Sequence, residues 1–145
     1  MQQLLEYAVN HPVLVGATVL LALAALAYEW SRARAGGQSV GPIEAVQLMN
    51  QGALVLDVRS REQYDAGHLI DARNVPGADL TGSIETLKRY RDKPVLTCCD
   101  TGLTANAAAR TLREQGFNKV ASLRGGLQAW RAENLPVVRS NAKGR

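Results

Sequence analysis

The chain of 145 residues has two cysteines, and its first 31 residues contain no lysine or arginine. Two cysteines cannot cross-link a whole domain, so its stability must come from an apolar core. The 13 glycines are too few and too aperiodic for collagen, and 46% hydrophobic with 21% charged residues excludes a disordered chain. One domain of about a hundred residues is expected beyond the first thirty.

Several sequence signals for ligands are also missing. The chain shows no metal-ligand spacing, no glycine-rich nucleotide loop and no nucleic-acid-binding motif. We therefore expect no metal, no cofactor and no nucleic acid among its ligands.

The formal net charge of +4 is unevenly distributed. Residues 1–31 carry −2, and residues 32–145 carry +6, because they hold all 17 basic groups against 11 acidic ones. Arg32 and Arg34 supply two of these charges and the tail over residues 139–145 supplies three more, which leaves residues 35–138 at +1. The basic groups therefore point to a membrane surface rather than to nucleic acid.

Pro12–Trp30 is a run of membrane-spanning length whose one charged residue is Glu29. Nineteen helical residues span about 28 Å, close to the hydrocarbon core of a bilayer. Tyr28 and Trp30 at one end, with Tyr7 near the other, are typical of interfacial aromatic belts. Residues 1–34 are thus predicted to form an anchor that contacts the lipid bilayer.

The flanking charges predict the orientation of this anchor. Arg32 and Arg34 follow the apolar run, whereas the residues before it offer only Glu6 and the amino terminus. The positive-inside rule then puts the carboxyl-terminal domain in the cytoplasm, and the anchor spans the inner (cytoplasmic) membrane once.

A cleaved signal peptide is an alternative interpretation of the same run. Ala25-Leu26-Ala27 has the small-x-small form of a cleavage site, but the leading residues lack the positive charge of a signal peptide. A mature protein that begins at Tyr28 would overturn the anchor. A buried core helix would show polar residues along one face, and this run shows none.

The rest of the chain divides into a linker over residues 35–39, a domain over residues 40–138 and the basic tail over residues 139–145. Apolar patterning and turn residues in the domain predict alternating strands and helices. The expected helices cover residues 42–51, 61–66, 79–90, 104–115 and a last segment containing Trp130, and the expected strands cover 54–56, 72–75, 95–97 and 120–123. This succession predicts an α/β domain with a parallel sheet flanked by helices.

The segments that follow two of these strands are the candidate site. In open α/β sheets, ligands bind where loops leave the carboxyl ends of strands. Asp57-Val58-Arg59 and Cys98–Leu103 both occupy such positions, so we expect them at one edge of the sheet.

A short loop joins the strand at 95–97 to the next helix and holds the candidate nucleophile, Cys99. Gly102 is free to adopt positive φ, so the loop can turn its backbone N–H groups inward and form an anion-binding nest. The helix start adds further N–H groups and favours a thiolate at Cys99. A buried core thiol is the competing interpretation, which fits Cys98 better because strand alternation sends neighbours to opposite faces. The candidate loop is Cys99, Asp100, Thr101, Gly102, Leu103 and Thr104.

Several short motifs in a fixed order carry a resemblance to a known family. The motifs are Leu56-Asp57-Val58-Arg59, Glu62-Gln63-Tyr64, Gly67-His68-Leu69, Ala72-Arg73-Asn74-Val75-Pro76, the Cys99–Thr104 loop, and Leu123-Arg124-Gly125-Gly126 with Trp130. As a set, these motifs resemble a rhodanese domain across residues 38–138, and with its anchor the chain resembles the membrane-anchored bacterial rhodaneses of the YibN type.

The resemblance implies sulfane-sulfur transfer through a persulfide on Cys99. Thiosulfate or a persulfide would be the donor, and a thiol or cyanide the acceptor. By analogy with the family, Arg59 would bind an anionic donor at the pocket mouth; an ion pair with Asp57 or Glu62 is an equal alternative. His68 is expected to be structural.

Two departures from related patterns refine this expectation. Many rhodaneses have a basic residue after the nucleophile, whereas here Asp100 places a carboxylate that disfavours doubly charged thiosulfate. Phosphatases of the same fold use a loop one residue longer that ends in arginine, and this chain has Thr104 and Ala105 there. Phosphatase activity is therefore not expected.

A Cys98–Cys99 disulfide is disfavoured by ring strain and by the reducing cytoplasm.

Two functions remain open from the sequence. The first is a sulfurtransferase that uses Cys99. The second is a catalytically weak adaptor that binds another membrane protein through the same fold.

Overall fold

The computed structural model describes residues 9–35 and 38–140, and within α2 the side chains of residues 31–35 are left out of the description. The chain divides into two compact units, Met1–Gly36 and Gly37–Arg145. The expectations for Tyr7, for the side chains of Arg32 and Arg34 and for tail residues 141–145 lie outside the described residues.

The first unit contains helix α2 (Pro12–Ala35). Its segment Pro12–Trp30 is long and apolar enough to cross a membrane, and none of it is buried within the protein. Leu20 is 70% exposed, and the Thr18 hydroxyl donates to the Leu14 carbonyl at 2.8 Å. A hydroxyl satisfied within its own helix is compatible with a lipid environment. The membrane-spanning helix predicted from the sequence is thus present as a candidate.

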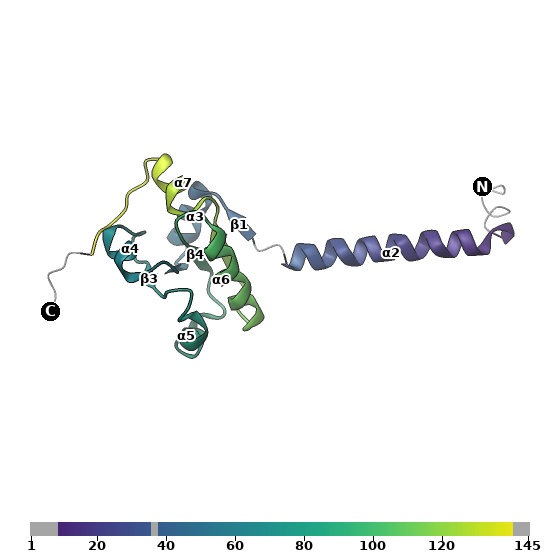
Figure 1. The fold of residues 1–145 in the computed structure, drawn as a ribbon, viewed down its shortest axis with the longest axis horizontal. Coiled ribbons are helices and arrows are strands. Elements are labelled where there is room, and N and C mark those ends of the chain that lie inside the picture. The colour runs from purple at the N-terminus through teal and green to yellow at the C-terminus, as the bar shows by residue number, and fades with distance from the viewer. Residues whose placement is uncertain (1–8, 36–37, 141–145) are drawn as a thin grey trace. The chain divides into compact units, whose positions relative to one another are not determined.

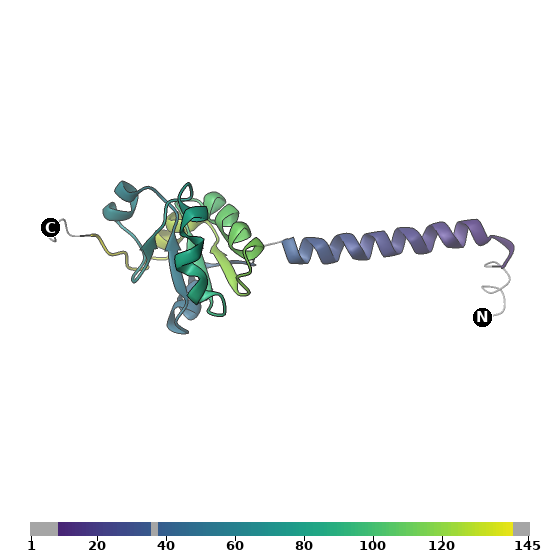
Figure 2. The same ribbon diagram turned by 90° about the horizontal axis from the view of Figure 1, so that it is seen from below.

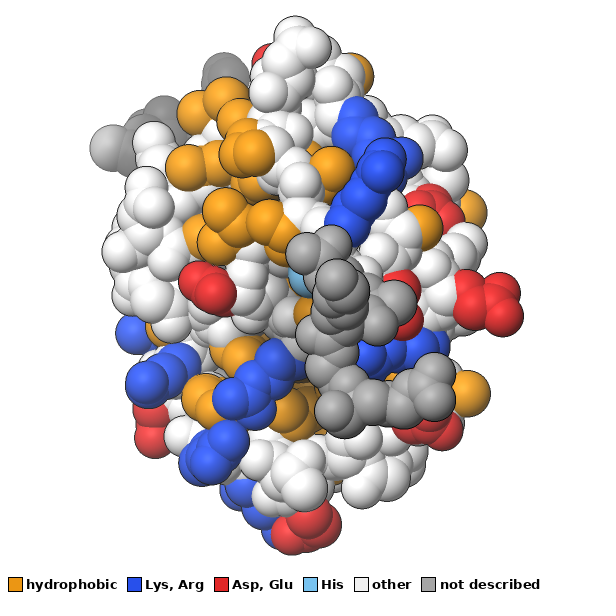
Figure 3. Space-filling view, turned by 90° about the vertical axis from the view of Figure 1, so that its left-hand side faces the viewer, with side chains coloured by type: hydrophobic (Ala, Val, Ile, Leu, Met, Phe, Trp, Pro, Cys, Tyr) orange, Lys and Arg blue, Asp and Glu red, His pale blue; other side chains and the backbone are white. Residues whose placement is uncertain are grey.

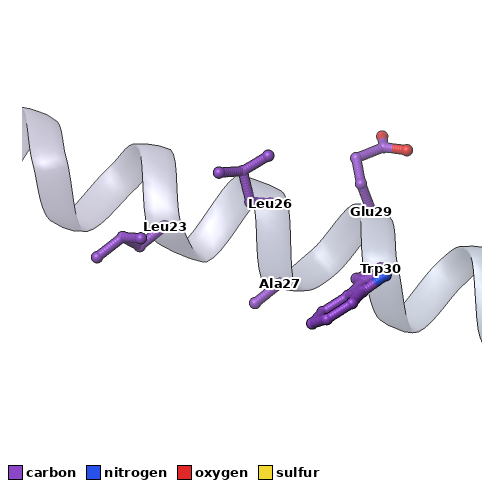
Figure 4. A pocket seen from close by; sticks show the side chains of 5 residues that line it. All are labelled: Leu23, Leu26, Ala27, Glu29 and Trp30. Atoms are coloured by element: carbon purple, nitrogen blue, oxygen red, sulfur yellow. The ribbon is translucent and has the colours of Figure 1, made fainter.

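A shallow depression lies on α2 itself. Leu23, Leu26, Ala27, Glu29 and Trp30 line it (Figure 4). Its lining is almost entirely apolar, so it offers no nucleophile and no acid–base pair for chemistry. A bilayer around α2 would cover it.

The second unit is an α/β domain built on a five-stranded sheet of order β1-β5-β4-β2-β3, in which every neighbouring pair is parallel (Figures 1 and 2). The strands are β1 (Gln38–Val40), β2 (Leu54–Asp57), β3 (Arg73–Asn74), β4 (Val95–Cys98) and β5 (Val120–Leu123). The helices are α3 (Pro42–Asn50), α4 (Arg61–Ala66), α5 (Leu80–Leu87) with the 3-10 turn η1 (Lys88–Tyr90), α6 (Leu103–Glu114) and α7 (Gly126–Ala132). The predicted fold class is confirmed.

Helices cover both faces of the sheet, and each face has its own apolar cluster. Leu54 and Leu56 of β2 pack with α5 and α6 on one face. Val55, between them, packs on the other face with residues of α3 and α7 such as Trp130. Side-chain alternation along the strand therefore divides the core into two layers.

One element differs from the sequence prediction. Gln38 and Ser39 were assigned to the linker, but they form β1 and pair with Ala121 and Ser122 of β5. The linker prediction is wrong for these two residues because an edge strand is held by backbone hydrogen bonds and needs few apolar side chains. Of the strand, only Val40 is buried.

The surface is uneven in composition. On the face drawn in Figure 3, hydrophobic side chains gather in the upper left part, and several Lys and Arg side chains lie below them.

Candidate active site

The Cys99 loop follows β4 and ends where α6 begins, at the carboxyl edge of the sheet. Cys99 is 4% exposed. Its Sγ accepts the backbone N–H of Gly102 at 3.0 Å and that of Ala105 at 3.4 Å. The sulfur therefore faces backbone donors at the amino end of a helix, which is an arrangement that stabilises negative charge.

Gly102 makes the tight turn of this loop. Its φ of 97° is in the left-handed region, where residues with a Cβ are strained. A Cβ at this position would lie 3.1 Å from the Leu123 carbonyl oxygen and 3.2 Å from the Gly125 nitrogen. The expected positive φ at Gly102 is thus present, and the space around it also excludes a side chain.

The loop is held from behind by the start of α7. A Cβ on Gly126 would lie 2.3 Å from the Cys99 carbonyl oxygen, so backbone meets backbone at this point. The Leu127 N–H donates to the Cys99 carbonyl at 2.8 Å, and the Gln128 N–H donates to the Asp100 carbonyl at 3.1 Å. Gly126 belongs to one of the motifs in the sequence, but its spacing along the chain gives no sign of this positioning role.

Arg59 is 7% exposed and pairs with the fully buried Asp57. Its Nη2 donates to Asp57 Oδ2 at 2.6 Å, and its Nε lies 3.0 Å from Asp57 Oδ1. The same Nη2 donates to the Gly67 carbonyl at 2.6 Å. Of the two interpretations of Arg59, the structure shows the ion pair, with Asp57 as the partner.

Arg59 also reaches the Cys99 loop. Its Nη1 donates to Asp100 Oδ1 at 3.1 Å, and Gln63 Nε2 donates to Asp100 Oδ2 at 2.9 Å. Both oxygens of the Asp100 carboxylate are therefore occupied by donors from the β2–α4 region. The two segments expected at one edge of the sheet do meet there. The role of Gln63 was missed because it depends on this contact between distant parts of the chain.

The local charge balance follows from these pairs. Burial opposes the charge on Arg59, but hydrogen bonds and charge interactions with Asp57 and Asp100 outweigh it and raise the pKa of Arg59. One guanidinium thus faces two carboxylates, for a sum of −1. That Asp100 disfavours a doubly charged anion stays a prediction, and Arg59 partly compensates the charge of Asp100.

Cys98 lies on the opposite side of the sheet from Cys99. It is fully buried among residues such as Leu96 and Leu123. Burial raises the pKa of Cys98 well above its usual value. The two neighbouring thiols thus lie on opposite faces of the sheet, as the alternation of side chains along the strand predicts.

The remaining loop side chains lie at the surface. Thr101 and Thr104 are exposed, and Leu103 is 79% exposed. His68, expected to be structural, stacks on Tyr64 with ring centroids 3.7 Å apart, and its Nδ1 lies 2.8 Å from the Tyr64 carbonyl. Within residues 9–35 and 38–140, no group of three or more His, Cys, Asp or Glu side chains could hold a metal ion.

Comparison with known proteins places this arrangement in a family. The model of the rhodanese-like domain matches residues 42–133. The uncharacterized protein YibN of Escherichia coli (strain K12) is 30% identical over 141 residues, which cover 96% of this chain and 99% of that protein. The thiosulfate sulfurtransferase GlpE of Pseudomonas fluorescens (strain SBW25) is 37% identical over 92 residues, which cover 63% of this chain and 83% of that protein.

A solved structure agrees with these relatives. The crystal structure of a rhodanese-related protein from Thermoplasma volcanium superposes with a TM-score of 0.63 at 29% identity. The match covers 70% of this chain and 97% of that one.

Proposed function

The chain belongs to the rhodanese-like domain family, and from this premise we propose that it is a membrane-anchored sulfurtransferase with Cys99 as its sulfur carrier. The observation that carries the proposal is the pair of backbone N–H groups, from Gly102 and Ala105, that donate to Cys99 Sγ at 3.0 and 3.4 Å. Donors placed in this way stabilise negative charge on the sulfur, and a thiolate at Cys99 would need no separate general base.

The first half-reaction loads one sulfur atom. The Cys99 thiolate attacks the outer sulfur of thiosulfate or of a persulfide. A new S–S bond forms, the S–S bond of the donor breaks, and sulfite or a thiolate leaves with the electron pair. The terminal sulfur of the resulting Cys99 persulfide is negatively charged, and the loop N–H groups stabilise it as an oxyanion hole stabilises oxygen.

The second half-reaction delivers that sulfur. A thiolate or cyanide attacks the terminal sulfur of the persulfide, the S–S bond to Cys99 breaks, and the Cys99 thiolate is restored. The cycle needs no external oxidant or reductant, because the electron pair released in each step stays on the leaving sulfur.

The charges at the site favour a persulfide donor over thiosulfate. A persulfide group brings one negative charge and thiosulfate brings two, while Asp57, Arg59 and Asp100 together already sum to −1. Asp100 is 44% exposed in its side chain, so its repulsion acts at the mouth of the site and is moderated by solvent.

The anchor sets the proposed location. α2 would cross the inner membrane once, and the two arginines after Trp30 would keep the domain in the cytoplasm. Protease treatment of spheroplasts tests this: the domain should be protected until the membrane is opened. Degradation in intact spheroplasts, or an amino terminus at Tyr28, would refute the location.

An adaptor for another membrane protein is a second candidate. The observation that favours it is the limited access of solvent to the candidate site, since Cys99 is 4% exposed and Arg59 is 7% exposed. In that case the Cys99 loop would be a structural remnant of the fold, and the domain would act by binding alone.

A turnover assay on the full chain in detergent separates the candidates. Thiocyanate formation from cyanide is measured with cysteine persulfide, whose net charge is −1 when the persulfide is ionised, and with thiosulfate as donors. We expect turnover with both donors and a higher kcat/KM for the persulfide. Turnover no faster than the uncatalysed reaction with either donor would refute the sulfurtransferase and leave the adaptor as the remaining candidate function.

A further inference from the structure

The parallel sheet gives the domain two chemically different edges. All strands run the same way, so their carboxyl ends form one edge, which holds the Cys99 loop, and their amino ends form the opposite edge. We call the second the amino edge and define it as the residues that lead into β4 and β5: 88–94 and 115–119. These segments lie side by side, since the Val95 N–H donates to the Lys119 carbonyl at 2.8 Å and the Asn118 N–H to the Arg91 carbonyl at 3.2 Å.

The amino edge is strongly basic. Its two segments contain five basic residues against Asp92, a net charge of +4. The near neutrality of the whole domain conceals this separation of charge, because the site at the carboxyl edge sums to −1. The basic residues are Lys88, Arg89, Arg91, Lys93 and Lys119.

Two of these cations, together with Arg73 of β3, gather over one aromatic ring. Arg73 lies 5.3 Å, Arg89 4.9 Å and Lys93 6.0 Å from the centroid of Tyr90. All three are exposed, while Tyr90 is half-buried, so the ring holds the charged groups together at the surface. Lys88 differs, because it pairs with Glu85. A tyrosine surrounded by cations combines the two residue types that favour a membrane–water interface.

The anchor is attached to this same edge. α2 ends at Ala35 and β1 begins at Gln38, and Gln38 is the amino end of a strand parallel to the others. The connection reaches at most about 11 Å when fully extended. A membrane crossed by α2 would thus be tethered to the amino end of β1, and a tether so short gives a high effective concentration of lipid at neighbouring strand starts.

We propose that the amino edge docks on the anionic lipid headgroups of the membrane that α2 crosses, with Arg73, Arg89 and Lys93 around Tyr90 at the centre of the contact. In this position the Cys99 loop, at the opposite edge, faces away from the bilayer and receives water-soluble sulfur donors. Each basic side chain near an anionic surface favours the docked state about fivefold. Three such side chains together favour it about a hundredfold.

Hydrogen–deuterium exchange of the full chain in nanodiscs tests the proposal. Nanodiscs of phosphatidylcholine alone are compared with nanodiscs that also contain phosphatidylglycerol. We expect slower exchange in peptides covering residues 88–94 and 115–119 only when phosphatidylglycerol is present, with no change in peptides of the Cys99 loop. Equal exchange at the amino edge in both lipids would overturn the proposal.

Charge-reversal variants make the test specific. Arg89→Glu/Lys93→Glu should lose the lipid-dependent protection, while Arg61→Glu/Arg131→Glu, which changes the net charge equally at exposed residues elsewhere, should keep it. Unchanged exchange in the peptides of β4 and α6 shows that each variant is folded. Loss of protection in both variants would mean that net charge acts without a defined surface, and would also overturn the proposal.

Discussion

Cys98 and Cys99 are consecutive residues, and both are almost fully buried, at 0% and 4% exposure. Cys98 packs in the cluster beneath α3 and α7, where burial raises its pKa well above the usual value. Cys99 packs on the other face and meets the N–H groups of Gly102 and Ala105. Burial alone therefore does not distinguish an inert thiol from a candidate nucleophile in this domain; the direction of nearby backbone dipoles does.

The largest expected difference between the two thiols is in turnover. Cys99→Ser should lower the rate of sulfur transfer by about a thousandfold or more, because an alcohol does not carry a persulfide. Cys98→Ser should retain activity within about tenfold, since Cys98 contacts the core and not the loop donors. Thiocyanate formation with a persulfide donor measures both. Similar losses in the two variants would remove the distinction between the thiols.

Disturbing the support behind the Cys99 loop should have the next largest effect on activity. Gly126→Ala would push a methyl group to 2.3 Å from the Cys99 carbonyl oxygen, which displaces the loop and should cost about a hundredfold in kcat/KM. Gly82→Ala is the matched control, because nothing lies within 4 Å of its Cβ position and Gly82 is in helix α5. It should leave activity unchanged and raise the free energy of unfolding by about 0.5–1 kcal/mol. Full activity in Gly126→Ala would show that the loop is positioned by other contacts.

Charge at the mouth of the Cys99 site should have a smaller effect. Asp100→Lys or Asp100→Arg removes a like charge and adds a cation, so the KM for thiosulfate should fall about three- to tenfold. Glu62→Gln is the control, because Glu62 is an exposed carboxylate directly before Gln63 in α4, and it should change KM little. Steady-state kinetics at low and high salt give the measurement, and the gain should shrink at high salt. An unchanged or higher KM in the Asp100 variants would count against the charge argument.

The smallest expected effect is on the free energy of unfolding, and it depends on Cys98 and not on Cys99. Its pKa is raised in the folded protein, so the folded state keeps the thiol proton while the unfolded chain releases it above about pH 8.5. The contribution of Cys98 is fully present below that pH and is lost as pH rises toward its folded pKa. Urea unfolding should show a decline of at most about 1.4 kcal/mol per pH unit in this window.

Cys98→Ala should remove that decline. A Cys99→Ser protein is the suitable background for the comparison, because Cys98 is then the one cysteine left. An equal decline with and without Cys98 would assign the pH dependence to other groups.

Local patterning in the sequence was sufficient for most of the fold. Leu54-Val55-Leu56 and Val120–Leu123 form buried strands, and the Ala105, Ala108, Ala109 and Leu112 face of α6 is buried as its spacing indicates. β1 was missed because Gln38 and Ser39 are polar residues at the edge of the sheet. Their pairing with β5, far along the chain, left no local pattern.

The candidate site was predicted in its residues but not in its connections. Cys99, Gly102 and the proximity of Arg59 followed from strand ends and turn chemistry. The bonds from Arg59 and Gln63 to Asp100 join residues 41 and 37 positions apart, and the contact of Gly126 with the Cys99 carbonyl depends on how two loops pack. Such contacts are set by tertiary structure, so spacing along the chain does not reveal them.

The most direct test of the central proposal is the mass of Cys99 after exposure to a sulfur donor. The full chain in detergent is treated with glutathione persulfide, alkylated and digested, and the peptides containing Cys98 and Cys99 are sequenced by mass spectrometry. We predict one added sulfur atom on Cys99, removed again by cyanide, and none in Cys99→Ser. Added sulfur on Cys98 alone, or none on either cysteine with persulfide and thiosulfate, would contradict the assignment of Cys99 as the sulfur carrier.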